Sequence, residues 1–153
     1  MFKLTPIPGG FTLTAGGLTL LTHTEEAPAL FIGSGVPRVN MFRGNFDIAD
    51  RLDLRLPLHV REVAETQVTC GNPDLAGDFT LAFSEEEGVL RVRGRAADES
   101  CNRFWVRFAA EAGEHVTGGG EQFSFLDLRG RRYPIWTREQ GVGRNKLTEI
   151  TRL

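Results

Sequence analysis

A two-residue alternation of apolar and polar side chains recurs along this 153-residue chain and limits its possible folds more than any other feature. It is clearest at residues 51–56, where every second residue is leucine, and it recurs at residues 79–83 and 103–108. Successive side chains of a β-strand point to opposite faces, so these segments predict sheets with one buried and one wet face. Because no long window has the i, i+3, i+4, i+7 spacing of a helix, we expect an all-β fold.

Glycine-rich turns separate the predicted strands. Gly16-Gly17 lies between alternating β-formers at residues 11–22 and predicts a β-hairpin. Gly33-Ser34-Gly35 follows the apolar residues 29–32, where we expect it to end a strand and form a turn. Three consecutive glutamates and a glycine before residues 89–93 predict another turn. Seven or more short strands at this spacing predict an antiparallel β-sandwich.

Charge and hydropathy exclude two classes of partner. The chain has 18 Lys and Arg against 20 Asp and Glu, a net charge of −2, whereas a dedicated nucleic-acid binder normally carries a basic face. No apolar stretch approaches the ~20 residues that a membrane-spanning helix needs. We therefore expect neither a nucleic acid nor a membrane as partner.

The cysteines and histidines offer no metal or disulfide framework. Cys70 and Cys101 are too few for a disulfide scaffold, and the beginning of the chain lacks the continuous apolar run of a signal peptide. We expect two free thiols and a cytoplasmic location, with a single bridge between them as the alternative. His23, His59 and His115 lie far apart in the sequence, so each is expected to be a surface or strand residue, and no metal is predicted.

The last part of the chain differs in composition. From Gly118 the alternation fades and glycine and arginine dominate, so we expect a sandwich core at residues 1–117 and a long polar loop region at residues 118–153. The final residues 148–153 look like the beginning of a β-strand, which predicts that the chain is a fragment of a longer protein.

Three kinds of chemistry are candidates for this polar region. Its glycine clusters lack the lysine of a phosphate-binding loop, so we expect them to permit tight turns instead. Its seven Lys and Arg, with Tyr133 and Trp136 interleaved, would suit a nucleic acid, but nearby acidic residues favour ion pairs with an adjoining domain. Glu121 and Glu139 could form the carboxylate pair of a glycosidase, although the sequence does not bring them together.

Several motifs resemble one enzyme family. Gly118-Gly119-Gly120-Glu121-Gln122 and then Asp127-Leu128-Arg129-Gly130 resemble the end of the N-terminal β-sandwich of glycoside hydrolase family 31. Pro134-Ile135-Trp136 and residues 139–146 are similar to its sulfoquinovosidase branch, as are residues 32–35 and 41–46. The resemblance implies a galactose-mutarotase-like sandwich that continues into a (β/α)₈ catalytic barrel.

The family resemblance also implies the function. Its members are retaining α-glycosidases whose two catalytic aspartates lie on the barrel, so no catalytic residue and no cofactor is assigned to this chain. The polar loop is expected to reach the mouth of the barrel, where Glu121 and Gln122 would bind the substrate and Arg144 would brace the loop or the pocket.

These assignments give the chain two possible roles. In the first, it packs on the barrel and shapes the rim of an active site for an α-glycoside of sulfoquinovose or glucose, is inactive alone, and self-associates through its exposed barrel-facing surface. In the second, it is an independent carbohydrate-binding or protein-interaction module.

Overall fold

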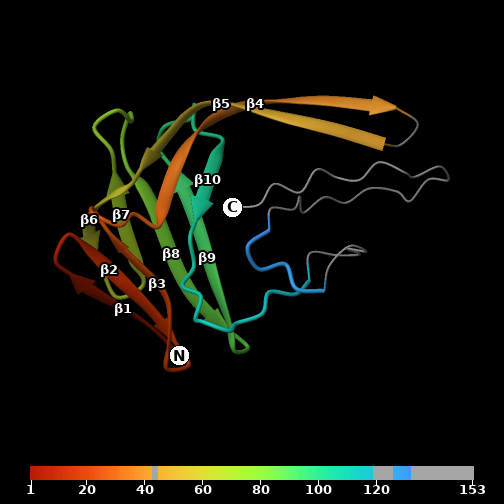
Figure 1. The fold of residues 1–153 in the computed structure, drawn as a ribbon. Coiled ribbons are helices and arrows are strands. Elements are labelled where there is room, and N and C mark those ends of the chain that lie inside the picture. Colours follow the sequence, from red (N-terminus) through yellow and green to blue (C-terminus); the bar gives the residue numbers. More distant parts are fainter. Residues whose placement is uncertain (43–44, 119–125, 132–153) are drawn as a thin grey trace. The chain divides into compact units, whose positions relative to one another are not determined.

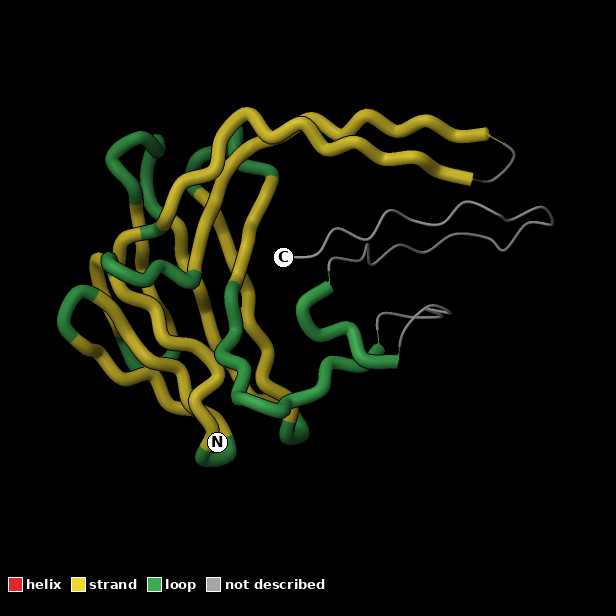
Figure 2. The backbone as a smooth tube through the Cα atoms, viewed as in Figure 1, coloured by secondary structure: helices red, strands yellow, loops and turns green. Residues whose placement is uncertain are grey.

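The computed structural model describes residues 1–42, 45–118 and 126–131 of the chain (Figure 1). They form ten strands and, as Figure 2 shows, no helix. The strands are β1 (Phe2–Ile7), β2 (Gly10–Ala15), β3 (Leu18–Thr24), β4 (Leu30–Phe42), β5 (Asn45–Pro57), β6 (His59–Val63), β7 (Gln67–Gly71), β8 (Phe79–Glu86), β9 (Val89–Ala96) and β10 (Arg103–Val106). The all-β prediction is confirmed, and none of the described residues forms a helix that could cross a membrane.

The strands form three sheets in the orders β1-β2-β3, β10-β4-β5 and β6-β7-β8-β9. Strand pairs with a determined register are antiparallel, as the alternating pattern predicted. Two connections are tight hairpins with two residues of positive φ, Gly16-Gly17 between β2 and β3 and Glu87-Gly88 between β8 and β9. Such turns match the right-handed twist of the flanking strands. The predicted first hairpin is therefore confirmed.

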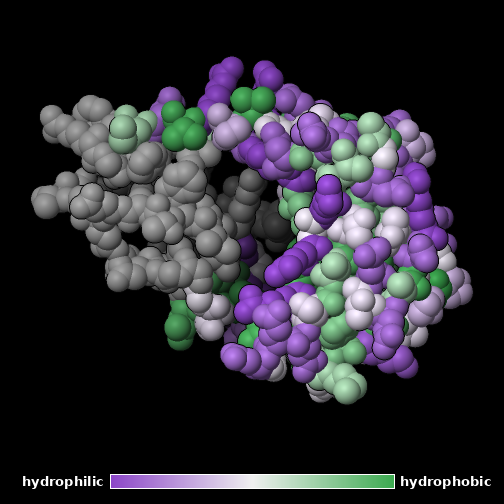
Figure 3. Space-filling model, turned by 180° about the vertical axis from the view of Figure 1, so that it is seen from behind, coloured by the Kyte–Doolittle hydropathy of each residue, from purple (hydrophilic) through white to green (hydrophobic). Residues whose placement is uncertain are grey.

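Contacts among the chain's residues divide it into two compact units. The first comprises Met1–Val36 and Asp50–Ala109, and the second comprises Pro37–Ala49 and Ala110–Leu153. The division predicted at residues 117/118 stays a prediction. The face of the molecule in Figure 3 mixes hydrophilic and hydrophobic side chains among the described residues, as expected for sheets with one wet face.

One hydrophobic core joins the three sheets within the first unit. Its buried residues come from all three sheets and from the segments between them: Leu4, Phe11, Leu13, Leu21, Ala29, Leu30, Ile32, Leu58, Val68, Cys70, Phe79, Leu81 and Phe83. Those that belong to strands lie on the inner faces, as the alternation predicted. Cys70 and Cys101 are free, so the alternative of a bridge between them is wrong.

The turn predicted at Gly33-Ser34-Gly35 is wrong, because these residues lie inside the long strand β4. A Cβ atom on Gly33 would lie 2.0 Å from the backbone oxygen of Leu54, and one on Gly35 would lie 2.9 Å from that of Arg51. Both glycines therefore let β5 approach β4 closely. A glycine in a strand can have this role as well as ending it.

A polar side chain in the core fixes the beginning of β4. His23 of β3 is fully buried, and its Nδ1 accepts hydrogen bonds from the backbone N–H groups of Ala29 at 3.0 Å and Leu30 at 3.2 Å. A nitrogen that accepts both bonds carries no proton, so the ring is neutral with its proton on Nε2. Burial lowers the pKa of His23, the Leu58 backbone opposes part of this shift, and the charge of His59 adds to it.

Candidate functional site

The residues predicted to contact substrate lie outside the described part of the chain. Glu121 and Gln122 fall within residues 119–125, and Arg144 falls within residues 132–153. The structure does describe the two segments that flank residues 119–125, both in the second unit. These segments are joined by hydrogen bonds among His115, Val116, Asp127, Leu128 and Arg129, which we call the loop base.

The carboxylate of Asp127 lies at the centre of the loop base. Its Oδ1 accepts the backbone N–H groups of Val116 at 3.2 Å and Arg129 at 2.9 Å, and its Oδ2 lies 2.8 Å from Nδ1 of His115. The bond from the Arg129 N–H, then those from His115 and Val116, lower the pKa of Asp127 to about 2. Asp127 is therefore ionised at neutral pH, so it holds the loop base together and is unsuited to act as a general acid.

The residues that follow Asp127 complete the closure. The buried Leu128 donates its N–H to the backbone oxygen of Val116 at 2.7 Å. The guanidinium of Arg129 donates to the backbone oxygens of Glu111 at 2.6 Å and Glu114 at 2.7 Å. Gly130 has a φ of +68°, a conformation that favours glycine. Each residue of the Asp-Leu-Arg-Gly motif thus has a defined part in holding together the two segments that flank residues 119–125.

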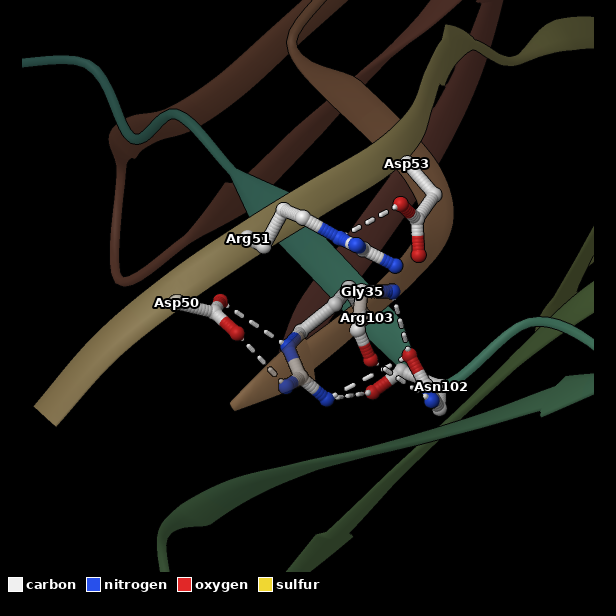
Figure 4. Close-up of polar contacts among 6 residues, drawn as sticks. All are labelled: Gly35, Asp50, Arg51, Asp53, Asn102 and Arg103. Atoms are coloured by element: carbon white, nitrogen blue, oxygen red, sulfur yellow. Dashed lines mark hydrogen bonds and ion pairs between the residues drawn. The ribbon is translucent and has the colours of Figure 1, made fainter. Parts of the chain in front are cut away.

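A second polar cluster joins β4, β5 and β10 in the first unit (Figure 4). Arg103 donates to both carboxylate oxygens of Asp50, at 3.1 and 2.8 Å. Asn102 accepts the N–H of Gly35 at 3.0 Å and donates to its carbonyl oxygen at 3.1 Å. The hydrogen bond from Arg103 lowers the pKa of Asp50, and the same bond raises the pKa of Arg103. The Arg103–Asp50 pair links the two outer strands β10 and β5, and Asn102, just before β10, binds the middle strand β4, so the cluster supports the sheet.

Arginines also cover aromatic rings on the sheet formed by β10, β4 and β5. The guanidinium carbon of Arg55 lies 4.5 Å from the ring centroid of Phe31 and 5.0 Å from that of Trp105, and that of Arg107 lies 4.9 Å from Phe31. Cation–π contacts of this kind stabilise half-buried aromatic side chains such as Phe31 and Trp105. An open pocket of about 280 Å³ adjoins Arg107, lined by Thr22 and by residues 27–29 and 107–109. Its lining has no carboxylate, histidine or thiol that could act as acid, base or nucleophile.

Neither cysteine is an activated nucleophile, because burial raises the pKa of both thiols, that of Cys70 to about 12. Among the described residues, no group of three or more His, Cys, Asp or Glu side chains could hold a metal ion.

Comparison with protein families identifies the kind of domain. Residues 64–147 match the model of the glycosyl hydrolase 31 N-terminal galactose mutarotase-like domain. The chain belongs to this family. The match includes the loop base and the positions of Glu121, Gln122 and Arg144.

The individual proteins to which this chain is similar are sulfoquinovosidases. The chain is 46% identical over 143 residues to the sulfoquinovosidase of Agrobacterium fabrum (strain C58), covering 93% of the chain and 21% of that protein. It is 39% identical over 147 residues to that of Escherichia coli (strain K12), covering 92% and 21%. A solved structure of a sulfoquinovosidase from E. rectale, in complex with an aza-sugar inhibitor, matches with a TM-score of 0.74 and 36% identity, over 95% of this chain and 22% of that one. The chain thus spans about a fifth of the length of these relatives.

The role of Asp127 and Arg129 in the loop base did not follow from the sequence pattern, although both belong to the motif that resembles the family. A partial signal was present. An aspartate whose side chain can accept the N–H two residues later is a known turn former, and Gly130 favours positive φ. The contacts with His115 and Val116, twelve and eleven residues away, have no local signal.

Proposed function

We propose that this chain is the N-terminal part of a retaining α-glycoside hydrolase of the sulfoquinovosidase type, in which it packs on the catalytic barrel and shapes the active-site rim. The observation that carries this proposal is the 46% identity to a sulfoquinovosidase over 93% of the chain. The two carboxylates needed for retention lie on the barrel, so the isolated chain is inactive. Two free, buried or half-buried thiols are in keeping with a cytoplasmic location for the enzyme.

Glu121 and Gln122 bind the sugar hydroxyls of the substrate on the side of its leaving group, and Arg144 braces the loop or the pocket. The loop base supports this role, because it joins the two segments that flank residues 119–125, among which are Glu121 and Gln122. Carboxylate and amide oxygens are suitable acceptors for sugar hydroxyls. This contact affects binding, whereas the chemical step belongs to the barrel.

The test uses the longer polypeptide that carries this chain, assayed on nitrophenyl α-glycosides of sulfoquinovose and of glucose. We expect hydrolysis with retention and a preference for sulfoquinovose, whereas a preference for glucose would favour an α-glucosidase instead. Glu121→Gln and Arg144→Lys should raise KM more than they lower kcat, and Glu99→Gln, in the exposed turn before β10, is the control. Unchanged kinetics for both variants would refute the proposed site.

The isolated chain is tested separately. It should not hydrolyse either glycoside, and the surface that the barrel covers should make it self-associate in analytical ultracentrifugation. Saturable binding of a sulfoquinovose glycoside by the monomeric chain, measured by calorimetry, would favour the alternative of an independent carbohydrate-binding module.

A further inference from the structure

Strand β10 has one unpaired edge. It pairs with β4 on one side only, and no strand among the described residues pairs with its other side. Arg107 donates its N–H to Ala29 on the β4 side at 2.8 Å, and in an antiparallel pair the direction of the N–H alternates along the strand. The N–H of Trp105 therefore points to β4, and those of Phe104 and Val106 point to the free edge.

The hydrophobic core is open along this edge. The ring of Phe104 stacks at 5.0 Å on Phe79, which is 4% exposed, yet Phe104 itself is 43% exposed. Val106, on the same face of β10, is 38% exposed. Val92 of the edge strand β9 lies opposite the buried Phe83 and is 48% exposed. These side chains belong to the inner faces of the sheets, so their exposure marks an incomplete core.

The four-residue length of β10 limits strand addition, but its edge lacks three other features that prevent it. Free edges in stable proteins are commonly protected by a proline, an inward-pointing charge or a bulge. The inner face of β10 carries only Phe104 and Val106, and its pairing with β4 is regular. An apolar, regular edge of this kind is a template for a further strand.

We propose that the free edge of β10 receives a β-strand from the part of the polypeptide that follows Leu153, whose apolar residues, at alternate positions, cover Val92, Phe104 and Val106. This inference rests on the proposed function, in which the chain continues into a longer enzyme. The relatives supply the length for it, since the alignments cover 92–93% of this chain but 21% of each relative. The strand completes the sandwich before the polypeptide reaches the barrel.

Amide hydrogen exchange at single-residue resolution in the longer polypeptide tests this pairing. The N–H of Trp105, already bonded to β4, is the internal reference. We expect the N–H groups of Phe104 and Val106 to exchange at least 100-fold more slowly than in an unfolded peptide, within about tenfold of Trp105. If they exchange at nearly the unfolded rate while Trp105 is protected, the proposal is wrong.

Two further measurements identify which polypeptide segment pairs with the free edge of β10. Protection that rises with protein concentration would assign the edge to a second copy of the chain and overturn the proposal. Protection of both N–H groups in the monomeric polypeptide that ends at Leu153 would assign it to residues of this chain and overturn it as well. The glycosidase assay of the longer polypeptide is independent, so an inactive polypeptide with a protected edge would refute only the proposed function.

Discussion

Replacing His23 tests whether one buried acceptor holds β3 to the beginning of β4. In His23→Leu the side chain keeps about its volume but loses Nδ1, so the N–H groups of Ala29 and Leu30 lose their only acceptor within the core. An unsatisfied buried donor costs about 1–3 kcal/mol. The bond to Leu30, at 3.2 Å, is the longer of the two, so we expect a total loss of about 2–4 kcal/mol.

That loss is a large part of the 5–15 kcal/mol typical of a folded domain. It corresponds to a fall in Tm of about 5–15 °C for a protein of this size. Urea unfolding at pH 8, followed by tryptophan fluorescence, measures it directly. His23→Gln is the matched control, because its amide oxygen can accept a backbone N–H and should recover part of the stability. Equal midpoints for wild type and His23→Leu would refute the role of Nδ1.

His23 also makes the stability of the fold depend on pH in a definite direction. Its pKa is lowered in the folded state, so the unfolded state binds the additional proton and the stability from neutral His23 is complete above pH 6.5. The stability falls as the pH drops from 6.5 towards the folded pKa, by up to about 1.4 kcal/mol at pH 5.5. Protonation puts a hydrogen on Nδ1 and removes the acceptor. Wild type should lose this stability between pH 7.5 and 5.5, whereas His23→Leu should lose less; parallel losses would contradict the assignment.

Three further predictions concern other parts of the chain. Gly33→Ala puts a Cβ against the backbone of β5 and should cost about 1–3 kcal/mol or more, and an unchanged urea midpoint would contradict it. Asp127→Asn in the longer enzyme should raise KM without moving the acidic limb of the pH–kcat/KM profile, because a carboxyl with a pKa of about 2 does not titrate there; a shifted limb would give Asp127 a catalytic role. At pH 8 a thiol reagent should modify Cys101 before Cys70, whose pKa of about 12 and burial make reaction wait for unfolding; equal rates would show that Cys70 is accessible.

The features that the sequence predicted correctly are local ones. The hairpin at Gly16-Gly17 needs only two residues with positive φ between alternating strands, and both requirements can be read from neighbouring residues. Gly33 was misread because a glycine at a turn and a glycine beneath a neighbouring strand look alike in sequence. What distinguishes them is the approach of β5, about twenty residues away.

The candidate site likewise has a part that the sequence predicted and a part that depends on tertiary structure. The resemblance to the family predicted Glu121, Gln122 and Arg144 on a polar loop, but nothing local indicates which groups join the segments that flank residues 119–125. Asp127 obtains its role from contacts with His115 and Val116 across the loop, and the burial of His23 likewise depends on strands that meet only in the folded chain. Alternation specified the faces of the strands, whereas the partners of the polar groups depend on tertiary structure.

The polar clusters of the described chain differ from its free strand edge in how completely their groups are partnered. Its polar clusters are internally complete, since Asp50 has Arg103, Asp127 has three donors, and the described carboxyls with shifted pKa values are held ionised. A general acid needs the opposite, a carboxyl whose pKa is raised towards neutral pH. The described chain leaves apolar side chains incompletely covered at the edge of β10. The described carboxyls with shifted pKa values are thus unsuited to act as the general acid, a role that the proposed function assigns to the barrel.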